Sequence, residues 1–479
     1  MRVVWRPSAY SRQIQRKPEK ERMKPQRRSS GRPRMGALWE RVVRAGNYPG
    51  PRGGSPPPMR GGVRVARMTS GRHVHPETSS ISEGYDPSLS VMAVRPPIYP
   101  VSTYCFATAQ QAAHHFEVAL GKVAAVPGER ESLIYARLNH PNAEMFEDAL
   151  RSVERGAAAC AAFTSGMSAI VTVVLTLAKP GKKVLYQRPV YGGTDHFFRQ
   201  MLPEWNIDAI AVAEGEWQEA LAEHGPNLAF VYVETPANPT LQMIDLGSLR
   251  AEIDRAVTDR HVPMVVDNTF LGPVFQSPLE HGADAVVYSA TKFLGGHSDL
   301  VAGAVTTRDP ELVARFKTMR AFFGTICEPF TAWMLQRSMA TLWLRMTKQS
   351  KNASKLVPLL VKHPAVLRVH YPSLFEGEQA RIFQKQCRAP GSMIAIELRG
   401  GREAAFRFLD ALKRVLIAVS LGGVESLACH PRTTTASEMS DDDLRVSGVT
   451  DGLVRISIGV EYWRDLAEDL SQALDAAAG

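Results

Sequence analysis

The sequence predicts an α/β protein with a mostly parallel central sheet, covered by helices on both faces, and a smaller C-terminal α/β domain. Two observations support this prediction. Between about residues 159 and 307, short runs of small and apolar residues alternate with longer segments of helical character, and repeated strand, helix and strand gives parallel neighbours with helices on both sides. From Pro329 the pattern changes to a long helical stretch and then to mixed elements, which indicates a second domain.

The individual elements follow from these runs. Strands are expected at residues 159–163, 183–186, 207–213, 228–233, 263–267, 283–288 and 302–307. Each run is short and apolar, as is typical of strands buried on both faces. A helix should begin after Gly166. In the second domain the helical stretch runs from Pro329 through Leu360, and strands are expected at 392–398 and 454–459.

With 479 residues the chain is long enough for two or three domains. We predict four segments. Residues 1–67 form a basic tail, and 68–130 form an extended arm that is rich in proline and makes contacts between subunits. Residues 131–330 form the large domain, and 331–479 form the small domain.

The positive charge of the chain belongs to its tail. Residues 1–67 contain 18 Lys and Arg against three Asp and Glu, which leaves 39 basic and 45 acidic residues for the rest. The tail is rich in Arg, Pro and Gly and should be disordered. It can be a translated upstream region with the true start near Met68, an organellar transit peptide or a nucleic-acid-binding arm; we favour the first.

The rest of the composition is that of an ordinary globular enzyme. The five cysteines are widely spaced and form no CxxC pair, which favours free thiols in a reducing cytoplasm and argues against a zinc site. No stretch is long and apolar enough to cross a membrane. The mildly acidic body also argues against nucleic-acid binding outside the tail.

The run Ser289-Ala290-Thr291-Lys292-Phe293-Leu294-Gly295-Gly296, preceded by Val265-Val266-Asp267, carries the strongest chemical signal. Lys292 follows a buried strand, at the edge where open α/β sheets place their ligands. A lysine there can bond covalently to the aldehyde of pyridoxal phosphate (PLP), and Asp267 can keep the ring nitrogen protonated. An isolated lysine is more often a solvated surface cation, but a surface lysine would not need to follow the carboxyl end of a buried strand.

A phosphate site is expected where Ser165-Gly166-Met167-Ser168 begins a helix directly after a strand. The free backbone N–H groups and the positive end of such a helix attract an anion. Gly166 and Met167 would donate through their backbones, and the hydroxyls of Ser289 and Thr291 would add to the site.

These motifs resemble those of the PLP-dependent enzymes of cysteine and methionine metabolism. That family includes cystathionine γ-synthase, cystathionine γ- and β-lyases, methionine γ-lyase and homoserine-ester sulfhydrylases. The resemblance extends from about Tyr85 to the C-terminus. It implies the type I fold of PLP-dependent transferases, an amino acid as substrate, and a homo-oligomer, a dimer of dimers, with its sites shared between subunits.

The resemblance also assigns roles to individual residues. Tyr135-Ala136-Arg137 is similar to the Tyr-Ser-Arg element that reaches into the neighbouring subunit and grips its phosphate, with Ala136 in place of Ser. Tyr191, before Gly192-Gly193, would stack on the ring and move protons. Asn238 would hydrogen-bond to the ring hydroxyl.

Substrate binding is assigned to the small domain. Ser420 and Arg455 resemble the residues that bind the substrate carboxylate, and an arginine in a short apolar strand is costly unless it meets an anion. Cystathionine-handling members are expected to carry Glu just before this serine, where our chain has Val419, as methionine γ-lyases do. Gly193 opposes this, because methionine γ-lyases typically carry Cys there. The expected His-Pro-Ala-Ser-Met-Thr-His-Ser motif is also altered, with Ala436 in place of its second His.

We therefore predict PLP-dependent elimination or replacement at Cγ of sulfur amino acids, with γ-elimination of methionine-like substrates slightly favoured. Cystathionine γ-synthase, cystathionine γ-lyase and O-acylhomoserine sulfhydrylase activities are the alternatives. A nucleic-acid-binding protein that acts through its tail belongs to a different class, as does a regulator with a PLP fold and no catalysis. The presence of Lys292, Asp267, Tyr191 and Arg455 speaks against the regulator.

Overall fold

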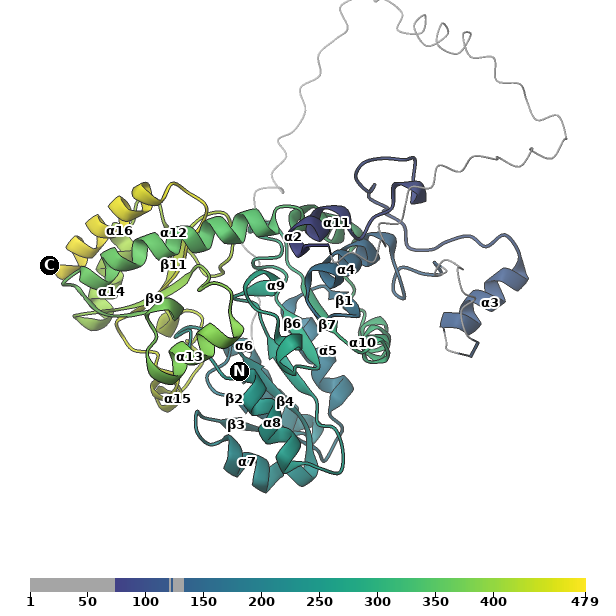
Figure 1. Cartoon of the computed structure of the whole chain (residues 1–479), viewed down its shortest axis with the longest axis horizontal. Coiled ribbons are helices and arrows are strands. Elements are labelled where there is room, and N and C mark those ends of the chain that lie inside the picture. Colours follow the sequence, from purple (N-terminus) through teal and green to yellow (C-terminus); the bar gives the residue numbers. More distant parts are fainter. Residues whose placement is uncertain (1–73, 120–121, 124–132) are drawn as a thin grey trace, which may run out of the picture. The chain divides into compact units, whose positions relative to one another are not determined.

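The computed structural model describes residues 74–119, 122–123 and 133–479 (Figure 1). The predicted basic tail, 1–67, lies outside the described residues. By their contacts, residues 68–479 belong to one unit, and within its described part the chain forms two sheets.

The first sheet has seven strands in the order β1-β7-β6-β5-β4-β2-β3. Strands β2 to β6 run parallel, and β7 is antiparallel to both β1 and β6. Every predicted strand of this domain is present to within two residues at each end, so the mostly parallel sheet is confirmed. The strands are β1 (Ala159–Phe163), β2 (Lys183–Gln187), β3 (Asp208–Val212), β4 (Leu228–Glu234), β5 (Met264–Asp267), β6 (Ala285–Tyr288) and β7 (Gly303–Thr307).

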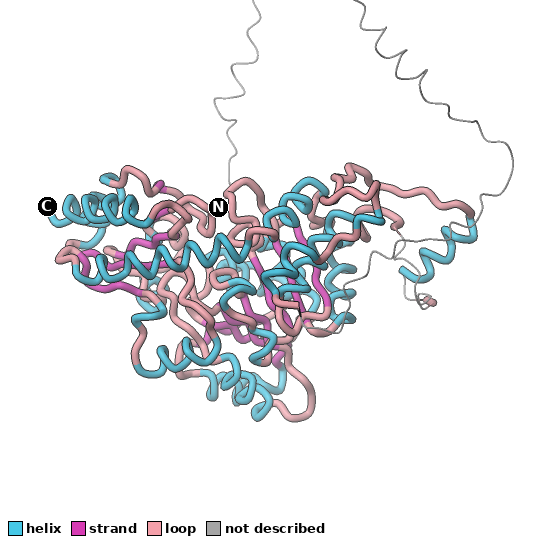
Figure 2. The backbone as a smooth tube through the Cα atoms, turned by 45° about the horizontal axis from the view of Figure 1, so that its top comes forward, coloured by secondary structure: helices cyan, strands magenta, loops and turns pink. Residues whose placement is uncertain are grey.

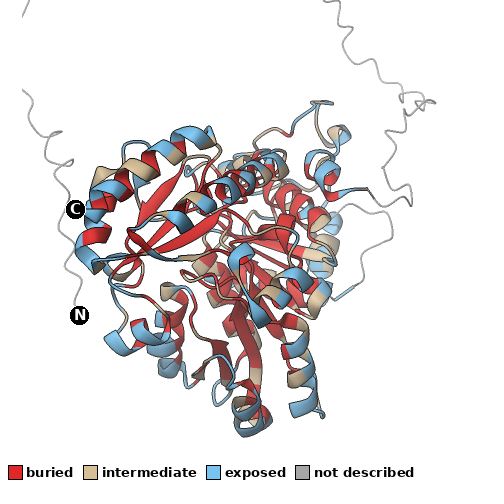
Figure 3. Ribbon diagram, turned by 60° about the vertical axis from the view of Figure 1, so that its left-hand side comes forward, coloured by how far each residue is buried: buried red, intermediate tan, exposed pale blue. Residues whose placement is uncertain are grey.

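Helices cover both faces of this sheet, as predicted. Along β5 the side chains of Met264 and Val266 enter one apolar cluster and that of Val265 enters another, because neighbouring residues of a strand point to opposite faces. Figure 3 shows the strands as buried between the helical layers. One face is covered by α5 (Gly166–Leu177) and α10 (Pro310–Phe323). The other is covered by α4 (Pro141–Val153), α7 (Trp217–His224), α8 (Leu246–Ala256), α9 (Gly272–Phe275) and α11 (Pro329–Met339).

The second sheet has five strands in the order β10-β11-β12-β9-β8 and is antiparallel except between β10 and β11. The two strands predicted here correspond to β9 and β12. The strands are β8 (Val366–His370), β9 (Met393–Leu398), β10 (Leu416–Ile417), β11 (Leu427–Cys429) and β12 (Leu453–Ser457). The accompanying helices are α12 (Leu342–Lys362), α13 (Gly377–Gln386), α14 (Gly401–Ala411), α15 (Asp441–Val446) and α16 (Trp463–Ala478), of which α12, α14 and α16 share its apolar core.

Helix α12 joins the two cores (Figures 1 and 2). Its first turns place Leu342 and Met346 in the core of the large sheet, and its later turns place Leu356 and Leu360 in the core of the small sheet. Because one continuous helix enters both cores, the relative position of the two sheets is fixed by side-chain packing on both.

The helical stretch predicted from Pro329 through Leu360 is divided into two helices, α11 and α12, by Ala340 and Thr341. The buried Arg345 guanidinium occupies the break. There the guanidinium donates to the Ser338 carbonyl at 3.0 Å and to the Thr341 hydroxyl at 3.1 Å. The end of α11 thus finds hydrogen-bond partners that a sequence pattern does not reveal.

The described part of the arm contains two helices that the sequence analysis did not predict, α2 (Pro76–Ser82) and α3 (Ala109–Ala119). Helix α3 buries none of its residues. Between these helices lies one 3-10 turn, Pro87–Leu89. The stretch that follows is tied to α11 and α4, where the Trp333 indole donates to Pro96 O at 2.9 Å and the Asn142 amide donates to Pro97 O at 2.8 Å.

Candidate active site

The carboxyl ends of three neighbouring parallel strands form one edge of the large sheet. Glu234 ends β4, Asp267 ends β5, and the two are direct partners in the strand pairing. Strand β6 ends at Tyr288 and leads into the turn that carries Lys292. The predicted placement of Asp267 and Lys292 after neighbouring strands is therefore what the structure shows, at the edge where such sheets bind ligands.

The Lys292 amine lies between the two domains. Its Nζ donates to the Ser420 hydroxyl at 2.8 Å. Burial, and then the positive charge of Arg455, lower the pKa of Lys292 to about 8. An amine with this pKa is partly unprotonated near neutral pH, as a nucleophile or general base must be.

Arg345 binds the backbone of the turn that carries Lys292. The guanidinium donates to the carbonyls of Phe293 at 2.7 Å and Leu294 at 3.3 Å. Gly296 adopts φ 70°, and a side chain there would collide with the same guanidinium. Gly296 therefore makes room for the arginine that fixes the turn.

The Asp267 carboxylate is buried among neutral partners. It accepts from the Thr269 N–H at 3.0 Å and from the Tyr232 hydroxyl at 3.3 Å. Burial raises the pKa of Asp267. A buried carboxylate with this environment is suited to a cationic ring nitrogen, which would provide the missing positive charge.

The amino end of α5 faces the same edge. Ser165 and Ser168 form a capping box at this end, so the Gly166 and Met167 N–H groups remain available. A Cβ atom on Gly166 would lie 2.9 Å from the Ser289 Cβ atom, which shows how closely the two predicted phosphate ligands approach. The Thr291 hydroxyl donates to Ala302 O at 3.1 Å, so its predicted contact with a phosphate would require this donor to turn.

Tyr191, Asn238, Arg455 and Ser420 are joined by hydrogen bonds. The Tyr191 N–H and the Asn238 N–H each donate to the Glu234 carboxylate at 2.8 Å. Arg455 in turn donates to the Asn238 side-chain oxygen at 3.1 Å and to Ser420 O at 3.0 Å. Residues predicted separately for the ring and for the substrate carboxylate therefore belong to one network.

Glu234 is the member of this network that the sequence analysis missed. It is 5% exposed, and burial, followed by the charge of Asp267, raises its pKa to about 8. A carboxylate at the end of an apolar strand, one strand away from Asp267, was the signal that could have revealed it.

Tyr135 and Arg137 lie apart from this network. The Tyr135 side chain is 42% exposed. Arg137 donates to Ala321 O at 3.0 Å, and its guanidinium lies 5.6 Å from the centre of the Tyr135 ring. Val419, by contrast, directly precedes Ser420 and is 56% exposed.

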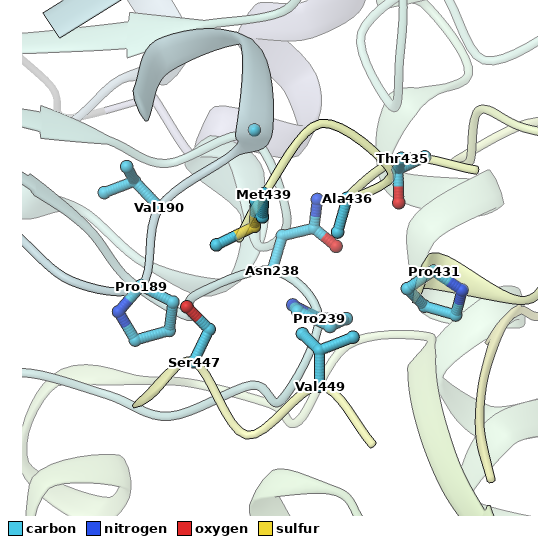
Figure 4. Close-up of a pocket in the computed structure, with 11 residues that line it drawn as sticks. Pro189, Val190, Asn238, Pro239, Pro431, Thr435, Ala436, Met439, Ser447 and Val449 are labelled. Atoms are coloured by element: carbon cyan, nitrogen blue, oxygen red, sulfur yellow. The ribbon is translucent and has the colours of Figure 1, made fainter. Parts of the chain in front are cut away.

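The segment around Ala436 packs against the Tyr191 loop (Figure 4). A Cβ atom on Gly192 would lie 2.7 Å from Thr435 O, so this close approach requires glycine. Asp443 in α15 pairs with Arg188 and Arg199 of the large domain and holds the segment in place. Between the two sides is a narrow pocket lined by residues that include Pro189, Val190, Asn238, Pro239, Ala436, Met439 and Val449.

The described residues contain neither a membrane span nor a metal-binding cluster. None of their helices has the length and hydropathy of a membrane span. Within the same residues, no group of three or more His, Cys, Asp and Glu could hold a metal ion. All five cysteines are free thiols.

Comparison with known proteins gives consistent matches over most of the chain. An L-methionine gamma-lyase from Pseudomonas deceptionensis is 37% identical over 403 residues, which are 84% of this chain and 97% of that protein. A cystathionine gamma-synthase from Mycobacterium bovis is also 37% identical, over 399 residues that are 83% of this chain and 96% of that protein.

Solved structures agree with these sequence matches. The crystal structure of cystathionine gamma synthase from Xanthomonas oryzae pv. oryzae, in complex with aminoacrylate and cysteine, superposes with a TM-score of 0.76 at 31% identity. The match covers 85% of this chain and 99% of that one. The family model described as "Cys/Met metabolism PLP-dependent enzyme" matches residues 77–475. The protein is therefore a PLP-dependent enzyme of the Cys/Met metabolism family, with the type I fold of that family.

Proposed function

We propose that this enzyme breaks the Cγ–S bond of methionine-like amino acids by γ-elimination, as a carbon–sulfur lyase of the methionine γ-lyase type. The observation that carries the proposal is Val419. It directly precedes Ser420, whose hydroxyl accepts from Lys292 and whose carbonyl accepts from Arg455. A neutral apolar side chain next to the substrate carboxylate site suits a thioether and offers no partner to the distal ammonium of cystathionine.

The residues of the site fit the cofactor of the family. Lys292 would hold the aldehyde end, Asp267 the ring nitrogen, and the amino end of α5 the phosphate. Asp267 has neutral hydrogen-bond partners in its buried position, and Lys292 has a pKa of about 8. When bound, PLP supplies the electron sink that stabilises negative charge at Cα.

The chain's own groups then have separate tasks. Arg455 would bind the substrate carboxylate through a charged hydrogen bond, with Ser420 beside it. Lys292 Nζ would take the proton from Cα, pass it on within the site, and then as a free amine again take one from Cβ, so that the thiol can leave from Cγ. Tyr191, 41% exposed at the edge of the site, would cover the ring and deliver a proton to the leaving sulfur.

A second candidate is cystathionine γ-synthase or γ-lyase activity, or O-acylhomoserine sulfhydrylation, and it is favoured by Gly193. A Cβ atom at this position would lie 2.7 Å from Tyr191 Cε1, so a cysteine would have to displace the ring. The chain therefore differs from the methionine γ-lyase pattern beside a residue that should face the substrate.

A product assay separates the two candidates. Purified enzyme is given methionine, cystathionine or O-acylhomoserine, each with and without cysteine, and 2-oxobutyrate, volatile thiol and cystathionine are measured. Methanethiol and 2-oxobutyrate from methionine, at a kcat/KM at least equal to that for cystathionine, are expected. Cystathionine as the main product from O-acylhomoserine and cysteine would favour the second candidate instead.

Val419→Glu should shift the preference toward cystathionine. Because the position is 56% exposed, the added ion pair is worth at most about 1 kcal/mol, or roughly a two- to five-fold change in the ratio of kcat/KM values. Val419→Gln, of similar size and without charge, is the matched control and should leave the ratio near that of the wild type. An unchanged ratio in the Glu variant would place the specificity elsewhere.

We further propose that each site is shared between two subunits, with Tyr135 and Arg137 reaching into the neighbour. These residues lie at an exposed apolar surface that includes Leu138, Phe322 and Phe323, and Phe322 is 80% exposed. Exposed apolar patches of this kind mark contact surfaces. An Arg fork brought in by the partner would suit the phosphate at the amino end of α5.

Mixing two inactive variants tests the shared site. In a hybrid of Arg137→Ala and Lys292→Ala subunits, one of the two sites combines an intact lysine with an intact arginine. Random exchange should therefore restore about a quarter of the wild-type activity. Each variant incubated alone is the control. If exchange is demonstrated by mass spectrometry and the mixture stays inactive, Arg137 acts within its own subunit.

A further inference from the structure

We propose that Glu234 is a positioning residue that sets the ring-facing groups of the site, and that both of its carboxylate oxygens are needed for this role. The inference rests on the proposed roles of Tyr191, Asn238 and Asp267. It adds a residue that acts through the two loops whose N–H groups it binds.

The geometry assigns one oxygen of Glu234 to each of two loops. Oε2 accepts from the Tyr191 N–H, and Oε1 accepts from the Asn238 N–H, both at 2.8 Å. The Tyr191 loop follows β2 and the Asn238 loop follows β4. A single carboxylate therefore fixes the spacing between the group expected to cover the ring face and the group expected to bind the ring hydroxyl.

The constraint reaches beyond these two loops. Asn238 Oδ1 accepts from Arg455 at 3.1 Å, Arg455 donates to Ser420 O at 3.0 Å, and Ser420 Oγ accepts from Lys292 at 2.8 Å. The path begins at Glu234 in the large domain, passes through the small domain and returns to the catalytic lysine. A shift of the Asn238 loop would thus change the position of Arg455 at the expected substrate carboxylate site.

The backbone of Glu234 is held in place as well. Its backbone N–H donates to the Gln187 side chain at 3.1 Å, and its neighbour in the strand pairing is Asp267. Two buried carboxylates at neighbouring strand ends repel each other when both are ionised. Two N–H donors on Glu234 and a cationic ring nitrogen facing Asp267 would offset that repulsion, so the arrangement is suited to the loaded enzyme.

An ordinary turn cap would also bind one or two N–H groups, and its loss would lower stability alone. A positioning role makes a different prediction, because it affects the orientation of the bound ring. The circular dichroism of the bound cofactor in the visible range reports that orientation independently of turnover. The dissociation constant of the cofactor is a second readout that does not depend on the choice of substrate.

Three variants test the proposal: Glu234→Gln, Glu234→Asp and the control Glu154→Gln. The amide of Gln keeps one acceptor and turns an NH₂ group toward the other N–H donor. Asp keeps the charge but is one methylene too short to reach both loops. Glu154 is a fully buried carboxylate of the same domain, bonded to the Tyr288 hydroxyl and with a pKa raised by burial to about 8. It is therefore a matched carboxylate outside the network.

Glu234→Gln should weaken cofactor binding and lower kcat by about tenfold or more each, the loss that corresponds to one buried N–H donor left without its acceptor. It should also change the visible dichroism, while KM changes less than kcat. Glu234→Asp should show the same dichroism change. If the Gln variant does not fold, the Asp variant alone tests the proposal. Glu154→Gln should lower the melting temperature at most and keep the spectrum.

Two results would overturn the inference. One is unaltered dichroism and cofactor affinity in both Glu234 variants, whatever their activity. The other is wild-type behaviour of Glu234→Asp beside a defective Gln variant, which would mean that charge alone matters. A wrong substrate assignment would appear in the products instead, with the dichroism results unaffected.

Discussion

Lys292→Ala is expected to abolish covalent attachment of the cofactor and to lower turnover by at least about 10²- to 10⁴-fold, the contribution of a positioned general base. The variant should still fold. Burial and Arg455 lower the pKa of this amine to about 8, which means that the folded site disfavours the lysine cation, and its removal relieves that cost. Cofactor binding through the phosphate should persist at reduced affinity.

Borohydride reduction followed by peptide mapping measures the attachment directly. In the wild type, borohydride should fix the cofactor to Lys292. When the cofactor is added back to cofactor-free protein, it should attach faster as the pH rises toward about 8, because more of the amine is then unprotonated. Lys182→Ala is the control, since Lys182 is exposed and precedes β2 at the opposite edge of the sheet. A label on any other lysine, or normal turnover in the Lys292 variant, would refute the assignment.

The strands of the large domain were predictable because each is a short apolar run buried on both faces. Along β4, for example, Phe230 and Tyr232 enter one core and Val231 and Val233 the other. Most positions of such a strand are apolar, so the run stands out in the sequence and a charged residue such as Asp267 marks its end. This is why the sequence also placed Asp267 correctly at a strand end.

What the sequence did not reveal depends on contacts between distant segments. Glu234 owes its role to two backbone N–H groups, one of them 43 residues away, and backbone groups leave no trace in a pattern of side chains. The break between α11 and α12 depends in a similar way on Arg345. Helix α3 buries no residue, and it lies in the proline-rich arm that the sequence analysis took to be extended.

Asp267→Asn is expected to leave the fold and some cofactor binding intact and to reduce kcat by about 10²- to 10³-fold, the usual loss when one preorganised charge partner is removed from a transition state. A neutral amide cannot keep the ring nitrogen protonated, so the electron sink weakens. Burial already raises the pKa of Asp267, which means that the carboxylate is less favoured in the folded protein than in the unfolded chain. The cofactor-free variant should therefore not be less stable at neutral or higher pH, where a raised pKa costs stability.

The measurement compares kcat, the absorption spectrum of the bound cofactor, and thermal unfolding of the cofactor-free protein. Asp208→Asn is the control, because Asp208 is exposed at the start of β3, at the opposite edge of the sheet. Turnover of the Asp267 variant within a few-fold of the wild type would show that another group serves the ring nitrogen. Glu234, its partner in the strand pairing, would then be the first candidate, and Glu234→Gln in the Asp267→Asn background would show a loss larger than the product of the two single losses.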